Sequence, residues 1–300
     1  MVGSKQTYNL WWRRSQETRA AYLFVLPVFL LFVLFRFGPT AASFVLSFTS
    51  YEIGGEVTFL GFDNYRQLLG DPIFWTSLRV TVTYTAIALP LTTITALGLA
   101  LMVSKAYRGV GLYRAIFFLP YVTSMVMTAI IWLWIYRPTD GGLLNSTLGV
   151  TGVEPVGWLL DKATVLPALA VMSVWKGFGY SMLIFVAGIQ AIPVAYHEAA
   201  QIDGATPWQL FRHITLPLLK PVLFFVLVIE TIASFQVFDA IYVMTSGGPA
   251  RASFSLVYML YNQGFVYFNF GYAVTIGVFL FIAIFVMTIV QRKVLESKET

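Results

Sequence analysis

Long apolar stretches dominate the chain. A helix needs roughly 20 apolar residues to cross the hydrocarbon core of a bilayer. Six stretches reach that length: Ala20–Ser47, Leu78–Val103, Ala115–Tyr136, Thr164–Ala191, Leu218–Val243 and Gly271–Val290. The third and fifth have the least sharply defined ends. The pattern predicts an all-α integral membrane protein, with six transmembrane helices in a domain at 20–290 and short tails at 1–19 and 291–300.

The polar segments between these stretches alternate in charge. Twelve Lys and Arg residues lie in the two tails and in segments 104–114 and 192–220, against five in the other loops. Basic residues accumulate in short loops on the cytoplasmic side of a membrane. Both termini and segment 192–217 are therefore predicted to be cytoplasmic. The same distribution accounts for the net charge of +5, so no nucleic-acid partner is predicted.

Composition excludes several kinds of chemistry. Only 11% of the residues are charged, against about a quarter in soluble domains. The chain has no cysteine, which excludes disulfides and thiolate sites. Its two histidines, His197 and His213, lie sixteen positions apart, which argues against a histidine metal site. No G-x-x-x-x-G-K-[ST] phosphate loop occurs, so the sequence offers no nucleotide site of that kind. We predict no catalytic residue, no metal and no cofactor in this chain.

The segment 192–217 has the pattern of two short helices. Val194–Asp203 is predicted to be a helix that ends at Gly204. Thr206 can cap a second helix, with Pro207 in its first position and Gln209 three residues after the cap. A helix with an apolar face favours a groove on a partner. The segment carries more apolar residues than a solvated linker needs, namely Ala199, Ala200, Ile202, Trp208, Leu210 and Phe211.

This segment resembles a known signature. The order Glu-Ala-Ala, three residues, Gly, nine residues, Ile-x-Leu-Pro is similar to that of the permease subunits of binding-protein-dependent ABC importers. The matching residues are Glu198, Ala199, Ala200, Gly204, Ile214, Leu216 and Pro217. Segments Gly61–Tyr65, Arg114–Pro120 and Gly247–Pro249 resemble the carbohydrate-uptake branch, the maltose- and glycerol-phosphate-type permeases. The resemblance covers about residues 20–290.

The resemblance implies a type I ABC importer permease fold in a bacterial or archaeal cytoplasmic membrane. One peripheral first helix and a five-helix core would pack against a homologous second permease. Two ATPase subunits, which bind ATP and Mg, would dock on segment 192–217, which is called the coupling segment below. An extracytoplasmic binding protein would deliver the sugar, which crosses by alternating access. The residues implied in ATPase coupling are Glu198, Ala199, Ala200, Asp203, Gly204, Ile214, Leu216 and Pro217.

Two ionisable residues, Lys176 and Glu230, fall near the middle of predicted spans. Each costs about 2.5–3.5 kcal/mol on membrane-insertion scales, so a reason for their presence is needed. They could pair with each other, line a cargo cavity, or do both. The resemblance implies cargo contacts from Trp175–Tyr180 and from the fifth span. Carried over to this chain, these contacts are Lys176, Gly177, Tyr180, Glu230 and Ser234.

The nature of the cargo stays open at this point. Lys176 and Glu230 depart from the neutral or apolar residues of sugar-only permeases, although both can bond sugar hydroxyls. A phosphorylated or acidic polyol such as glycerol phosphate would also suit Lys176. Gln236 and Asp239 are predicted to face solvent or an outer partner rather than the cavity. A membrane-embedded enzyme is a distant alternative, because only Lys176 and Glu230 could supply its chemistry. A channel or receptor would not explain Glu198–Pro217.

Overall fold

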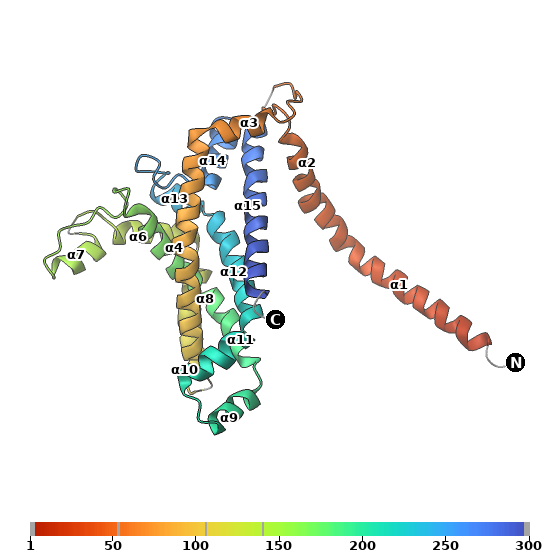
Figure 1. The fold of residues 1–300 in the computed structure, drawn as a ribbon. Coiled ribbons are helices and arrows are strands. Elements are labelled where there is room, and N and C mark those ends of the chain that lie inside the picture. Colours follow the sequence, from red (N-terminus) through yellow and green to blue (C-terminus); the bar gives the residue numbers. More distant parts are fainter. Residues whose placement is uncertain (1–3, 53–54, 106, 140, 297–300) are drawn as a thin grey trace.

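The computed structural model describes residues 4–52, 55–105, 107–139 and 141–296, with side chains described from 18 to 295 within these ranges. Across these ranges the chain folds into helices. Its extended pairings there are two isolated bridges, Thr49 with Phe59 and Glu52 with Asn269. The predicted all-α class is confirmed (Figure 1).

Five helical segments among the described residues are long and apolar enough to cross a membrane. They correspond to five of the six predicted spans. The first runs through α1 (Ser4–Phe32), the π-helical turn η1 (Val33–Phe37) and α2 (Gly38–Leu46), so the predicted N-terminal tail continues into the first span as one helix. The others are α4 (Pro72–Val103), α8 (Val165–Gln190), α12 (Lys220–Phe235) with α13 (Asp239–Met244), and α15 (Phe270–Glu296).

The remaining predicted span is broken in its middle. Here α5 (Val110–Val122) and α6 (Met125–Ile135) meet at an angle of 94°. Thr123 and Ser124 adopt extended backbone between them, and the Thr123 hydroxyl donates to the carbonyl of Pro120 at 2.6 Å. Such hydroxyl–backbone bonds compete with continuation of a helix. The apolar pattern predicts the two arms of this span but not the elbow between them.

Helix α8 packs against α4, α5 and α12, and Figure 1 shows it beside α4 and α12. Two of its glycines set the closest approaches. A Cβ on Gly179 would lie 2.2 Å from the carbonyl oxygen of Phe117 in α5. A Cβ on Gly188 would lie 2.8 Å from the side chain of Val222 in α12. Small residues permit this contact in membranes, where packing holds helices together without a hydrophobic driving force.

Within the first span, α2 packs against α15, whereas α1 points away from the bundle in Figure 1. None of its most apolar window is buried, whereas between 28% and 50% of the corresponding windows of the other four spans are buried. The position agrees with the predicted peripheral first helix. Its apolar surface is therefore left for lipid or for another subunit.

The segment Gly61–Tyr65, which carried part of the resemblance, forms a clasp at one end of the bundle. It begins α3 (Asp63–Gly70). The buried Asn64 amide donates to the carbonyls of Ser47 and Thr49 at 3.0 and 2.9 Å. The Thr275 hydroxyl of α15 donates to the same Ser47 carbonyl at 3.1 Å. The clasp thus joins the end of the first span to α3 and α15.

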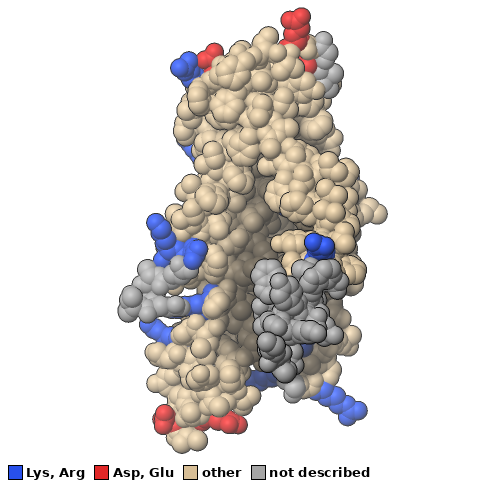
Figure 2. Space-filling model, turned by 90° about the vertical axis from the view of Figure 1, so that its right-hand side faces the viewer, with Lys and Arg blue, Asp and Glu red and all other residues tan. Residues whose placement is uncertain are grey.

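Charge is distributed unevenly between the two ends of the molecule. Both described ends of the chain lie towards the side that carries α9 (Val194–Ile202), and α3 lies towards the other side (Figure 1). Figure 2 shows most of the visible Lys and Arg side chains on the lower half, towards α9. Basic loops of this kind face the cytoplasm. The cytoplasmic placement of both termini stays a prediction that this arrangement favours.

Replacing Asn64 by Ala should lower thermal stability. The variant removes the buried donor to the Thr49 carbonyl and one of the two donors to the Ser47 carbonyl, which keeps the Thr275 hydroxyl. Loss of these bonds costs on the order of 1–3 kcal/mol. The measurement is the midpoint of thermal unfolding in detergent. Gln67→Ala, an exposed position on the same helix, is the control and should leave the midpoint unchanged. Equal midpoints for the two variants would contradict a structural role for the clasp.

Candidate functional site

The first candidate site is the coupling segment, residues 192–217, which follows α8 and begins with α9. Helix α9 ends in a left-handed residue, Gly204, with φ of +78°. The amide of Ala205 donates to the carbonyl of Ala200 at 2.9 Å, and that of Gly204 donates to Gln201 at 3.0 Å. This pair of bonds is the Schellman ending of a helix, in which glycine takes the left-handed position without steric cost. The predicted helix and its end at Gly204 are confirmed.

A second short helix, α10 (Pro207–Leu210), follows at once. The Thr206 hydroxyl accepts a hydrogen bond from the backbone N–H of Gln209, and the side-chain carbonyl of Gln209 accepts one from the backbone N–H of Thr206. Together these two bonds form the predicted capping box. The chain continues through η2 (Phe211–Thr215) and α11 (Leu216–Leu218) into α12. The His197 ring of α9 lies 3.3 Å from the Thr215 hydroxyl of η2. The first short helix therefore contacts the segment that leads back into α12.

This segment presents uncovered apolar side chains at the end of the molecule. Val194, Ile202 and Trp208 are 68%, 86% and 65% exposed. Water-exposed apolar groups gathered on short helices mark an interaction surface. Of the residues implied in coupling, Glu198, Ala199, Asp203, Gly204 and Pro217 are exposed, and Ala200, Ile214 and Leu216 are partly buried.

The second candidate site is a polar cavity of about 260 Å³ between α4, α6, α8 and α12. Three of the five residues predicted to contact cargo line it: Gly177, Glu230 and Ser234. Gln236 and Asp239 also line it. Both side chains are also exposed, so the prediction that they face solvent or an outer partner stays a prediction, and their place at the break between α12 and α13 adds them to the cavity lining.

Lys176 and Glu230 do not pair with each other. The Ser181 hydroxyl donates to Glu230 Oε1 at 2.5 Å. Lys176 Nζ instead donates to backbone carbonyls at the elbow of the broken span. Tyr180 stacks on Tyr121 with ring centroids 4.8 Å apart. Neither Lys176 nor Tyr180 is among the residues that line the cavity, so their predicted cargo contacts stay a prediction.

Ser173 is a cavity residue that sequence reasoning missed. Its hydroxyl oxygen is buried and lies beside the Tyr84 hydroxyl, which belongs to the same cavity lining. Ser173, Gly177 and Ser181 are spaced four residues apart on α8, so they form one stripe along the helix. That spacing of small and polar residues in an apolar span was the signal that could have found it.

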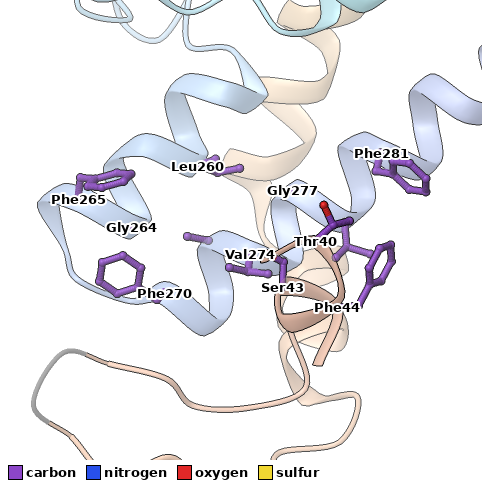
Figure 3. Close-up of a pocket in the computed structure, with 12 residues that line it drawn as sticks. Thr40, Ser43, Phe44, Leu260, Gly264, Phe265, Phe270, Val274, Gly277 and Phe281 are labelled. Atoms are coloured by element: carbon purple, nitrogen blue, oxygen red, sulfur yellow. The ribbon is translucent and has the colours of Figure 1, made fainter. Parts of the chain in front are cut away.

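A larger pocket of about 390 Å³ lies elsewhere, between α2 and the α14–α15 hairpin. Thr40, Ser43 and Phe44 face Gly277 and Phe281 across it (Figure 3). No ionisable side chain is among its lining residues. Size therefore does not identify the transport site, and the smaller polar cavity fits a hydroxyl-rich or charged cargo better. Within the described residues, no group of three His, Asp or Glu side chains could hold a metal.

The sequence profile of the family described as "Binding-protein-dependent transport system inner membrane component" matches residues 88–298. This range includes α8, the coupling segment and α12, and thus both candidate sites. The chain belongs to this family. The permease is accordingly a transport component of a membrane rather than an enzyme.

Curated relatives match almost the whole permease. A trehalose/maltose transport system permease protein of Thermococcus litoralis is 36% identical over 285 residues, covering 94% of this chain and 95% of the relative. A probable ABC transporter permease protein of Bacillus subtilis is 36% identical over 295 residues, covering 95% and 94%. An sn-glycerol-3-phosphate transport system permease protein of Agrobacterium fabrum is 35% identical over 285 residues, covering 92% and 94%.

A solved structure has the same fold. It is a chain of the bacterial alginate ABC transporter in complex with alginate pentasaccharide-bound periplasmic protein. The TM-score is 0.83 at 24% identity, with 96% of this chain and 98% of that chain covered. The predicted ABC importer permease fold is confirmed.

Proposed function

We propose that this permease is the membrane-spanning subunit of an ATP-driven importer that carries a sugar or oligosaccharide inward. An extracytoplasmic binding protein delivers the cargo, and two ATPase subunits, which hold ATP and Mg, supply the energy. A homologous second permease completes the membrane part, in the cytoplasmic membrane of a bacterium or archaeon. Relatives named for trehalose and maltose transport, at 36% identity over nearly the full chain, support the sugar class.

The coupling segment is the observation that carries the proposal. Its two short helices meet at Gly204, lie beyond the bundle and expose Ile202 and Trp208. Helix α9 follows α8, which lines the cavity, and α10 leads back into α12, which lines it too. A partner that binds this segment can therefore displace both α8 and α12, which line the cavity. ATP binding and hydrolysis would thus open the cavity alternately to each side.

The electrostatics of the cavity favour a neutral cargo over a phosphorylated one. Among its lining side chains, Glu230 and Asp239 are the Asp, Glu, Lys or Arg residues, and both are acidic. The cation that would have suited a phosphate, Lys176, is engaged with three backbone carbonyls instead. A phosphate beside two carboxylates would meet like charges. Sugar hydroxyls can donate to Glu230 and Asp239 and can bond the hydroxyl of Ser173.

The test reconstitutes the permease in lipid nanodiscs with its second permease, ATPase and binding protein. ATP hydrolysis should rise when binding protein and a neutral oligosaccharide are added together, and uptake into proteoliposomes should follow. Hydrolysis that responds only to glycerol phosphate would overturn the neutral cargo and keep the permease role. A chain that purifies alone, with turnover of its own, would overturn the permease role as well.

Replacing Gly204 by Leu should uncouple hydrolysis from uptake. Leucine in the left-handed region costs roughly 1–2 kcal/mol, on the order of a tenfold loss of the docked conformation. Nothing lies within 4 Å of a Cβ at this position, so the bundle should still insert. Gly204→Asn is the matched control, because asparagine tolerates that backbone region. Normal uptake by the Leu variant would count against a coupling role.

Replacing Glu230 by Gln should weaken cargo binding. A charged hydrogen bond contributes about 1.5–3 kcal/mol and a neutral one about 1 kcal/mol, so the half-saturating sugar concentration should rise about twofold to thirtyfold. The measurement is initial uptake rate against sugar concentration. Thr288→Val is the control, because the Thr288 hydroxyl bonds Ile284 within its own helix. An unchanged half-saturation would make Glu230 a structural residue.

A further inference from the structure

The break in the third span creates an electrostatic problem inside the membrane. A helix end leaves its last carbonyls without intrahelical partners. In hydrocarbon, every such group must be satisfied by the protein. The carbonyls of Tyr121 and Thr123 are in this position at the elbow between α5 and α6. Pro120 O is partly satisfied by the amide and hydroxyl of Thr123.

Lys176 of α8 supplies the missing donors. Its Nζ lies 2.7 Å from Thr123 O, 2.9 Å from Tyr121 O and 3.3 Å from Pro120 O. An ammonium has three N–H donors, and three carbonyls use all of them. The same nitrogen lies 5.6 Å from the centre of the Tyr121 ring, within range of a cation–π interaction. At the elbow, the Lys176 ammonium is therefore surrounded by three backbone carbonyls of one broken span.

The neighbours of Lys176 on α8 hold the same two helices. Gly179 admits the Phe117 carbonyl of α5 so closely that a Cβ would lie 2.2 Å from it. Tyr180 stacks on Tyr121 at an interplanar angle of 15°. Trp175 meets Trp132 of α6 at 5.8 Å. Trp175, Lys176, Gly179 and Tyr180 of α8 therefore contact the broken span. Ser173 and Gly177 of the same helix line the cavity.

The elbow also belongs to the cavity wall and to the coupling path. Met125, the first residue of α6, lines the cavity. Helix α8, which carries Lys176, ends at Gln190, and the coupling helix α9 begins at Val194. A displacement of α9 that moves α8 would reach Met125 through the elbow, if the elbow follows α8, and through the contact between Trp175 and Trp132.

Building on the proposed function, we propose that Lys176 is a positioning residue of the transport cycle, which locks the elbow of the broken span to α8. Its ammonium makes α5, α6 and α8 move as one body when the coupling segment moves. The charge is thereby kept in a membrane span for a mechanical reason, and the cargo does not contact it. This role differs from the cargo contact that the sequence alone implied.

Three variants, each in the full complex in lipid nanodiscs, distinguish a Lys176 that holds the elbow from a Lys176 that binds cargo. Lys176→Met keeps the length of the side chain but removes its donors. Lys176→Arg keeps donors and charge. Lys176→Ala leaves space for propylammonium, which replaces the missing atoms. The chain has no cysteine, so Ile116→Cys in α5 and Ile131→Cys in α6, at sites 53% and 57% exposed, take spin labels selectively when the other subunits are made cysteine-free.

The expected result is a change in both geometry and transport. With Lys176, the distance distribution between the two labels should be narrow. In Lys176→Met it should broaden or shift, uptake should fall about tenfold or more, and ATP hydrolysis should continue. Lys176→Arg should keep the narrow distribution and most of the uptake. In Lys176→Ala, propylammonium at tens of millimolar should restore both readouts, whereas propanol should not; this arm also applies if the Met variant does not fold.

Two outcomes would overturn the proposal. One is a narrow distribution and full uptake in Lys176→Met. The other is a narrow distribution with only a raised half-saturating sugar concentration, which would make Lys176 a cargo ligand. If the unmodified complex transports no sugar, the proposed function fails, and the label distances still report whether Lys176 holds the elbow.

Discussion

Every backbone polar group inside a bilayer must find its partner within the protein, and this constraint organises the permease. Intact helices meet it by themselves. The broken third span cannot, because the elbow at Thr123 exposes carbonyls at membrane depth. Lys176 meets the requirement from a neighbouring helix. The break and the charge in a membrane span, each costly alone, therefore satisfy each other.

Close helix packing turns this local solution into a mechanical unit. Gly179 brings α8 against the backbone of α5, and Gly188 brings it against the side chains of α12. Transmembrane helices gain their association energy from such contacts. Because α8 and α12 also flank the coupling segment, the polar cavity lies between the helices that a docked ATPase would move. In the proposed mechanism, coupling and cargo binding would thus involve the same few helices.

Charge then selects among cargo classes. The part of the cavity that this chain supplies presents Glu230 and Asp239 and the buried hydroxyl of Ser173. With Lys176 engaged at the elbow, these groups favour the hydroxyls of a neutral sugar. Relatives of this permease are named both for sugars and for glycerol phosphate at similar identity. The local electrostatics therefore separate cargo classes that overall likeness does not.

The sequence by itself determined the local features. Apolar length set the spans, and the chemistry of Gly204, Thr206 and Gln209 set the two short coupling helices, because propensity, caps and turns act over a few neighbouring residues. The tertiary structure alone decided the partners of Lys176 and Glu230 and the elbow at Thr123. Such contacts join residues about 50 positions apart, and a side chain in an apolar span can reach several helices.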